Sequence, residues 1–189
     1  MSEVILGIDP GLTRCGYGVV AKEKSRAVKF VAVGVIQSPS TMELSARLAL
    51  IGDEIAKVLD TQKPERVAIE RVFSQKNLNT VIGIAQISGI IVYLCQQRGV
   101  PVIFYTPTEV KAAVTGSGKA AKDQVMFMVQ KILKLKGLPK PADAADALAV
   151  AITSAWRGDL NSSSSETSST ETNAQKKWRQ AIASSKKQK

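Results

Sequence analysis

The stretch Val4-Ile5-Leu6-Gly7-Ile8-Asp9-Pro10-Gly11 decides how this chain begins to fold. An apolar run that ends in Pro-Gly predicts a buried strand followed by a sharp turn. The carboxylate of Asp9 is therefore carried from a buried strand onto that turn. Because an ionised carboxylate is costly to remove from water without a partner, Asp9 is a candidate functional residue.

Three further acids lie in similar apolar settings. Glu70 ends the short run Arg66-Val67-Ala68-Ile69, and Asp143 and Asp146 lie within the otherwise uncharged stretch 141–150, which reads as a helix. The i, i+3 spacing of the two aspartates places them on one face of that helix. If the strands ending in Asp9 and Glu70 are neighbours and the helix packs on them, four carboxylates converge.

Four converging carboxylates would repel one another unless cations neutralised them. Two Mg²⁺ ions, which prefer oxygen ligands, would relieve this repulsion; one would activate water and the other would stabilise a leaving oxygen. The pattern therefore predicts phosphodiester hydrolysis. Each acid also has a structural alternative: Asp9 bonding amides of its own turn, Asp143 capping its helix, and Glu70 pairing with Arg71. Asp146, one turn inside the helix, fits such an alternative least well.

Composition favours a polyanionic partner. The chain has 26 Lys and Arg against 16 Asp and Glu, a net charge of +10, and residues 160–189 hold only six of the basic and two of the acidic residues. The remainder thus carries +6 of its own, which suits nucleic acid, although a ribosomal or membrane-surface protein would share this charge. Histidine is absent, which excludes Ser-His and Cys-His nucleophiles and His-ligated zinc.

The two cysteines, Cys15 and Cys95, have no metal-type spacing and are expected to be reduced, packed thiols. The N-terminus enters a strand without a signal sequence, and the longest apolar stretch, 81–95, is too short to cross a bilayer. We therefore expect a cytoplasmic protein.

The periodicity of apolar residues predicts an α/β fold, a mixed sheet covered by helices. The expected strands are Val4–Asp9, Gly16–Ala21, Val28–Ile36, Arg66–Glu70 and Val102–Tyr105, and the expected helices are Thr41–Leu59, Asn79–Gln97, Thr108–Val114, Lys122–Leu135 and Ala142–Trp156. Asn79–Gln97 is apolar nearly all round, so it is expected to be buried against the sheet or a second subunit. Residues 1–158 form the expected domain, and 159–189 a Ser-rich, basic, disordered tail. Trp178 lies there among basic residues that suit nucleic acid, but a merely solvated tail is the favoured alternative.

The segment Gly116-Ser117-Gly118-Lys119 resembles a phosphate-binding loop only superficially. Ala113 and Ala120 stand where the Walker pattern needs Gly and Ser or Thr, so an NTPase site is not expected. We interpret this segment, with Lys111 and Lys122, as amides and ammonium groups that grip a DNA phosphate; the alternative is a flexible loop.

Taken in order, three motifs closely resemble the RuvC family of Holliday-junction resolvases. They are Gly7-Ile8-Asp9-Pro10-Gly11, Ala68-Ile69-Glu70-Arg71-Val72-Phe73 and Ala142-Asp143-Ala144-Ala145-Asp146-Ala147-Leu148-Ala149, with Val110-Lys111 and Lys122-Asp123-Gln124-Val125 between the last two. The resemblance covers about residues 3–156. The first motif alone would fit any ribonuclease-H-like or actin-like fold.

The resemblance implies a ribonuclease-H-like fold, a five-stranded mixed sheet flanked by helices on both faces. It implies a homodimer that nicks opposite strands of four-way junction DNA with two Mg²⁺ per subunit, for which Mn²⁺ substitutes, and the branch-migration proteins RuvA and RuvB as partners. Asp9, Glu70, Asp143 and Asp146 match the catalytic, metal-binding acids, and some family members have histidine at the position of Asp143.

The resemblance also implies roles in DNA binding. Phe73 matches an aromatic residue that wedges against bases at the junction centre, although an ordinary core phenylalanine is the alternative. Lys111 and Lys122 match basic residues near the scissile backbone, and Asn79–Gln97 resembles the helix that packs the dimer. The tail after Trp156 has no counterpart in the family's core.

Two other functions remain open from the sequence. One is another nuclease of the ribonuclease-H fold, for instance one that processes ribosomal RNA. The other is a junction-binding protein without catalysis, against which the four intact carboxylates count.

Overall fold

The first three strands form an antiparallel half-sheet. In this computed structural model, which describes residues 2–24, 26–71, 78–138 and 141–163, β1 (Glu3–Asp9) pairs with β2 (Arg14–Lys22), and β2 pairs with β3 (Val28–Gln37). The β1–β2 register opposes Asp9 to Gly16. The acid that ends β1 therefore lies beside the start of β2.

The other half of the sheet is parallel. β4 (Arg66–Glu70) pairs in parallel with β1, and β5 (Val102–Tyr105) pairs in parallel with β4, which gives the order β3-β2-β1-β4-β5. Ile8 pairs with Ile69, so Asp9 and Glu70 follow side by side at the carboxyl ends of neighbouring strands. This adjacency, which the convergence of the acids requires, is confirmed.

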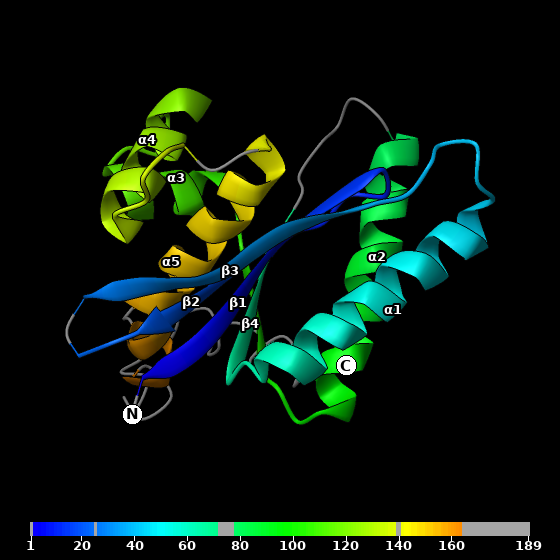
Figure 1. Cartoon of the computed structure of the whole chain (residues 1–189), viewed down its shortest axis with the longest axis horizontal. Coiled ribbons are helices and arrows are strands. Elements are labelled where there is room, and N and C mark those ends of the chain that lie inside the picture. The colour runs from blue at the N-terminus through cyan, green and yellow to red at the C-terminus, as the bar shows by residue number, and fades with distance from the viewer. Residues whose placement is uncertain (1, 25, 72–77, 139–140, 164–189) are drawn as a thin grey trace, which may run out of the picture. The chain divides into compact units, whose positions relative to one another are not determined.

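Helices cover both faces of the sheet, as Figure 1 shows. One face packs against α1 (Leu44–Gln62) and α2 (Leu78–Gln97). The other packs against α3 (Pro107–Thr115), α4 (Lys122–Leu133) and α5 (Ala142–Ser163). The predicted five-stranded mixed sheet flanked by helices on both faces is thus confirmed.

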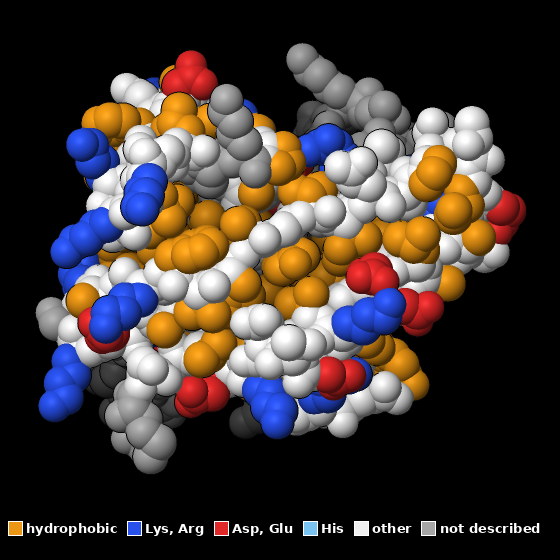
Figure 2. All heavy atoms as spheres, in the orientation of Figure 1, with side chains coloured by type: hydrophobic (Ala, Val, Ile, Leu, Met, Phe, Trp, Pro, Cys, Tyr) orange, Lys and Arg blue, Asp and Glu red, His pale blue; other side chains and the backbone are white. Residues whose placement is uncertain are grey.

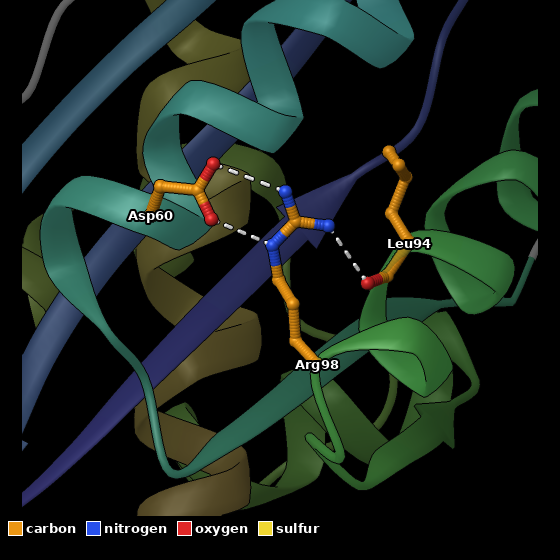
Figure 3. Close-up of polar contacts among 3 residues, drawn as sticks. All are labelled: Asp60, Leu94 and Arg98. Carbon is orange, nitrogen blue, oxygen red and sulfur yellow. Dashed lines mark hydrogen bonds and ion pairs between the residues drawn. The ribbon is translucent and has the colours of Figure 1, made fainter.

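A guanidinium–carboxylate pair links the end of α2 to α1. Arg98, just beyond α2, places Nε 2.7 Å from Oδ1 and Nη2 3.0 Å from Oδ2 of Asp60 on α1, while Nη1 donates to the carbonyl oxygen of Leu94 (Figure 3). Both carboxylate oxygens of Asp60 are therefore occupied by one arginine.

α2 is buried on one side only. Its side facing the sheet includes Ile87, Ile91 and Cys95, all fully buried. On the opposite side Ile82 and Tyr93 are 55% and 61% exposed. The sheet therefore covers only one side of the helix that the sequence predicted to be buried. The apolar residues on its other side are left exposed.

Figure 2 shows how side chains are distributed on one face of the molecule. Lys and Arg side chains gather on the side that carries α4 and the turn between β2 and β3, while hydrophobic side chains lie over the middle of the face. The exposed Phe30 and Val31 on the edge strand β3 are among the large hydrophobic residues at the surface.

Several helix boundaries differ from the sequence prediction, among them the start of α1 and the end of α5. α1 begins at Leu44 rather than Thr41, because the Glu43 side chain accepts hydrogen bonds from the amides of Ser45 and Ala46 and so caps the helix there. α5 continues to Ser163, so the first residues of the expected disordered tail are helical. The chain divides into two compact units, Met1–Gly158 and Asp159–Lys189, and residues 164–189 lie outside those described.

Both cysteines are free and buried, as expected. Within the described parts of the chain, no helix has the length and apolar character needed to cross a membrane.

Candidate active site

Strand alternation sets Asp9 and Glu70 on the same face of the sheet. Ile5 on β1 and Ala68 on β4 pack in the core beneath α5, whereas their sequence neighbours point to the α1–α2 side. Because side chains alternate along a strand, Asp9 and Glu70 share the face of Ile5 and Ala68. Both acids therefore project toward the layer that contains α5.

Glycines on β1 and β2 let the backbone of α5 approach the sheet closely. A Cβ atom at Gly7 would overlap the carbonyl oxygen of Ala147, and one at Gly16 would overlap the carbonyl oxygen of Asp143. Gly18 similarly faces the backbone of Leu148. The alternation Gly16-Tyr17-Gly18 is the sequence signal for this contact.

Close approach of α5 brings three of the four predicted acids together. Asp9, Asp143 and Asp146 each offer a carboxylate oxygen, and these oxygens all lie within 4.8 Å of one another. Glu70 lies outside this triplet but close enough to Asp9 for its negative charge to raise the pKa of that carboxyl. Clustered oxygen ligands without histidine or thiolate suit a hard divalent cation such as Mg²⁺.

Asp143 and Asp146 of α5 are each paired with a cation. Lys122 at the start of α4 places Nζ 2.7 Å from Oδ2 of Asp146. Arg14 at the start of β2 places Nε 2.5 Å from Oδ2 of Asp143. The Lys122 contact joins two residues that the sequence singled out, whereas Arg14 was not predicted. Asp143 also lies in the first turn of α5, where the helix dipole favours an anion.

A cavity of about 200 Å³ opens beside the acids. Glu70 and Asp146 line it together with Lys111 and Lys122, so acidic and basic groups share one recess. A phosphate entering this recess would meet the ammonium groups of Lys111 and Lys122 beside carboxylates of the kind that bind a divalent cation. The two predicted lysines are therefore placed at the acidic cluster.

The acids strongly perturb one another's ionisation. Burial, followed by the negative charges of Glu70, Asp146 and Asp143, raises the pKa of Asp9 to about 8. The pKa of Glu70 is also raised, first by burial and then by Asp146. Lys122 opposes both shifts. Without a further cation, the cluster therefore retains protons near neutral pH, as carboxylates crowded in a recess do.

The loop around Lys119 lies apart from this recess. Lys119 is exposed and does not line the cavity of Lys111 and Lys122. The amides of Gly116, Ser117 and Lys119 already donate to acceptors within the chain, so they do not form the phosphate grip interpreted from the sequence. Phe73 falls within residues 72–77, which lie outside the described residues, and its role stays a prediction.

Comparison with known proteins places this geometry in a family. The family model "Crossover junction endodeoxyribonuclease RuvC" matches residues 5–154. A protein of that name from Paenarthrobacter aurescens is 51% identical over 183 residues, which cover 97% of each chain. Another from Leifsonia xyli subsp. xyli is 58% identical over 156 residues, which cover 82% of this chain and 75% of the relative.

Solved structures agree with the sequence comparison. Thermus thermophilus RuvC in complex with Holliday junction substrate is 34% identical, with a TM-score of 0.80 over 84% of this chain and 96% of that chain. The yeast mitochondrial Holliday junction resolvase Ydc2, at 14% identity and a TM-score of 0.60, shares the fold. This chain belongs to the RuvC family of crossover junction endodeoxyribonucleases.

Proposed function

We propose that this protein is a Holliday-junction resolvase, an endonuclease that nicks opposite strands of four-way DNA junctions in recombination and repair. The observation that carries the proposal is the convergence of Asp9, Asp143 and Asp146 at the end of β1, within a chain of the RuvC family. A relative of 34% identity and the same fold is solved in complex with a Holliday junction substrate.

We propose that Asp9, Glu70, Asp143 and Asp146 hold two Mg²⁺ ions and that Mn²⁺ substitutes for Mg²⁺. The fit rests on the donor set, since three carboxylate oxygens lie within 4.8 Å of one another. It also agrees with Asp9, whose pKa is raised first by burial and then by the negative charges of Glu70, Asp146 and Asp143. When bound, the ions supply activation of the attacking water and stabilisation of the leaving oxygen. Asp9 must lose its proton to serve as a ligand.

The lysines of the recess have a distinct part in this proposal. Lys111 and Lys122 line the same cavity as Glu70 and Asp146, where an ammonium group can bind a non-bridging phosphate oxygen. Lys122 is half-exposed, so it can exchange its contact with Asp146 for one with DNA. Lys119, exposed and outside the recess, would bind backbone further from the scissile bond.

Opposite strands need two active sites, and we propose that the exposed face of α2 joins two copies of the chain. Ile82 and Tyr93 leave apolar surface on this helix. An apolar cavity of about 380 Å³ lies on the same helix and includes Val81, Ala85 and Gly89 in its lining, which gives a recess for a partner's side chain.

Membership of the family supports the remaining proposals. We propose that RuvA and RuvB are partners of this protein and that Phe73 wedges the junction open. We also propose that the protein works in the cytoplasm, a location that fits both a DNA substrate and reduced cysteines. Residues 159–189 form the proposed tail, whose basic groups would add affinity for DNA.

The experiment that tests the proposal uses a labelled mobile four-way junction with Mg²⁺ and maps the nicks. We expect symmetrical incisions by the wild type and none by Asp146→Asn, which removes a ligand charge while preserving volume. Asp53→Asn, an exposed acid on α1, is the matched control and should cleave normally. Cleavage of structured RNA but not the junction would contradict the proposal, and so would junction binding without nicking.

A further inference from the structure

Arg14 makes a one-sided contact with an acid of the site. Its Nε lies 2.5 Å from Oδ2 of Asp143, and the two side chains are 40% and 28% exposed. In the Arg98–Asp60 pair, by contrast, the guanidinium occupies both carboxylate oxygens (Figure 3). The contact from Arg14 holds one oxygen of Asp143 and leaves Oδ1 available.

The backbone fixes the point from which Arg14 reaches Asp143. Arg14 lies two residues before Gly16 on β2 and shares its face, the face on which α5 packs. Ser38 anchors the preceding loop. Its amide donates to the carbonyl oxygen of Thr13, 3.1 Å away, and its hydroxyl donates to the carbonyl oxygen of Leu12. Arg47 donates to the Thr13 hydroxyl at 2.9 Å.

Fold stability does not account for this arrangement, because partly exposed ion pairs stabilise proteins little. A hydrogen bond to a ligating carboxylate, however, fixes its orientation toward a metal ion. We propose that Arg14 is a positioning residue of the metal site, holding Oδ2 of Asp143 so that Oδ1 faces the cluster of Asp9 and Asp146. This inference rests on the proposed metal site.

The test is calorimetric titration of the full-length protein with Mn²⁺ alone, without DNA. Arg14→Ala should weaken Mn²⁺ binding about tenfold to hundredfold, as loss of such a supporting contact does. Arg98→Ala, which removes an ion pair remote from the acids, should leave Mn²⁺ affinity unchanged. In an Asp143→Ala background, Arg14→Ala should have no further effect, because its action passes through Asp143.

Melting temperatures in EDTA separate folding from positioning. Arg14→Ala should melt close to Arg98→Ala; if Arg14→Ala does not fold, Arg14→Gln provides the same test with a smaller change of shape. Wild-type or tighter Mn²⁺ binding by the Arg14 variant, together with weakened binding by Asp146→Asn, would overturn the role of Arg14 while leaving the metal site standing. Wild-type binding by Asp146→Asn and Asp143→Ala would overturn the metal site itself.

Discussion

The backbone of Asp143 packs so closely on Gly16 that a Cβ atom at Gly16 would overlap the carbonyl oxygen of Asp143. Gly16 opposes Asp9 across the β1–β2 ladder, so the first turn of α5 rests directly beside the acid that ends β1. The absence of one Cβ atom therefore determines how near Asp143 comes to Asp9. Position 16 acts on the site without carrying any reactive group.

Gly16→Ala should displace the start of α5 and impair cleavage more than folding. Overpacking a close contact costs about 1–3 kcal/mol, whereas a shift of roughly 1 Å in a catalytic group costs on the order of a hundredfold in rate. Denaturant unfolding and junction cleavage at saturating protein measure the two effects. Gly137→Ala, where a Cβ would meet nothing within 4 Å, is the control. Wild-type cleavage by Gly16→Ala would show that the helix does not need this contact.

Metal affinity should depend on pH through Asp9. The pKa of this carboxyl is raised to about 8, so below that pH a divalent cation must displace its proton. Mn²⁺ affinity should rise about tenfold per pH unit from pH 6 toward 8 and then level off. Titration calorimetry at several pH values measures the slope, and Asp9→Asn should flatten it. A flat profile for the wild type would contradict the assignment of this proton to the site.

The raised pKa of Asp9 has the opposite effect on the stability of the metal-free protein, which should fall as pH rises. Because the folded pKa of Asp9 lies above its ordinary value of 3.8, the folded state retains a proton that the unfolded state has lost. The contribution of Asp9 to stability therefore falls as pH rises from about 4 to about 8. Unfolding in EDTA should show this fall for the wild type and much less of it for Asp9→Asn.

Lys122 and Lys119 should affect different steps. Lys122→Gln removes an ammonium group from the acidic recess, so we expect cleavage at saturating protein to fall by roughly a hundredfold or more. Lys119→Gln should leave that rate unchanged and flatten the salt dependence of junction binding by about 0.9 units of log-log slope for the lost phosphate contact. Equal effects of the two substitutions on the cleavage rate would contradict this division.

Much of the fold could be predicted from the sequence, because apolar periodicity and turn residues are local signals. The strand ending in Asp9 and the i, i+3 spacing of Asp143 and Asp146 identified these acids as candidate site residues without knowledge of their spatial neighbours. What local patterns cannot supply is a contact between distant segments. The pairing of Arg14 with Asp143 joins residues 129 positions apart, and nothing in either neighbourhood indicates it.

The loop before α4 shows the converse limitation. Gly116-Ser117-Gly118-Lys119 suggested free amides for a phosphate, but the Thr115 hydroxyl accepts from the Ser117 amide and turns the loop upon itself. The sequence allowed a phosphate-binding segment or a flexible loop, without revealing where the hydrogen bonds of the segment go. Accounting for each backbone donor requires the three-dimensional structure.

The exposed face of α2 should govern assembly, and Gly89 offers a direct test. Gly89 lines the apolar cavity on this helix, and a Cβ there meets nothing within 4 Å, so the folded monomer can accommodate a longer side chain. Gly89→Arg should therefore leave folding intact while placing an unpaired charge in the proposed dimer interface. Because burying an unpaired charge costs several kcal/mol, dimerisation should weaken on the order of a hundredfold or more.

Light scattering across a range of protein concentrations measures this dissociation, and nick mapping on the junction reports its consequence. Gly137→Arg adds the same charge at another position where a Cβ meets nothing within 4 Å, and it should remain dimeric. The dissociated Gly89 variant should lose paired incision of opposite strands, since each strand needs its own active site. If the Gly89→Arg protein is dimeric at the same concentrations as the wild type, the interface lies elsewhere than on α2. That outcome would not bear on the proposed metal site.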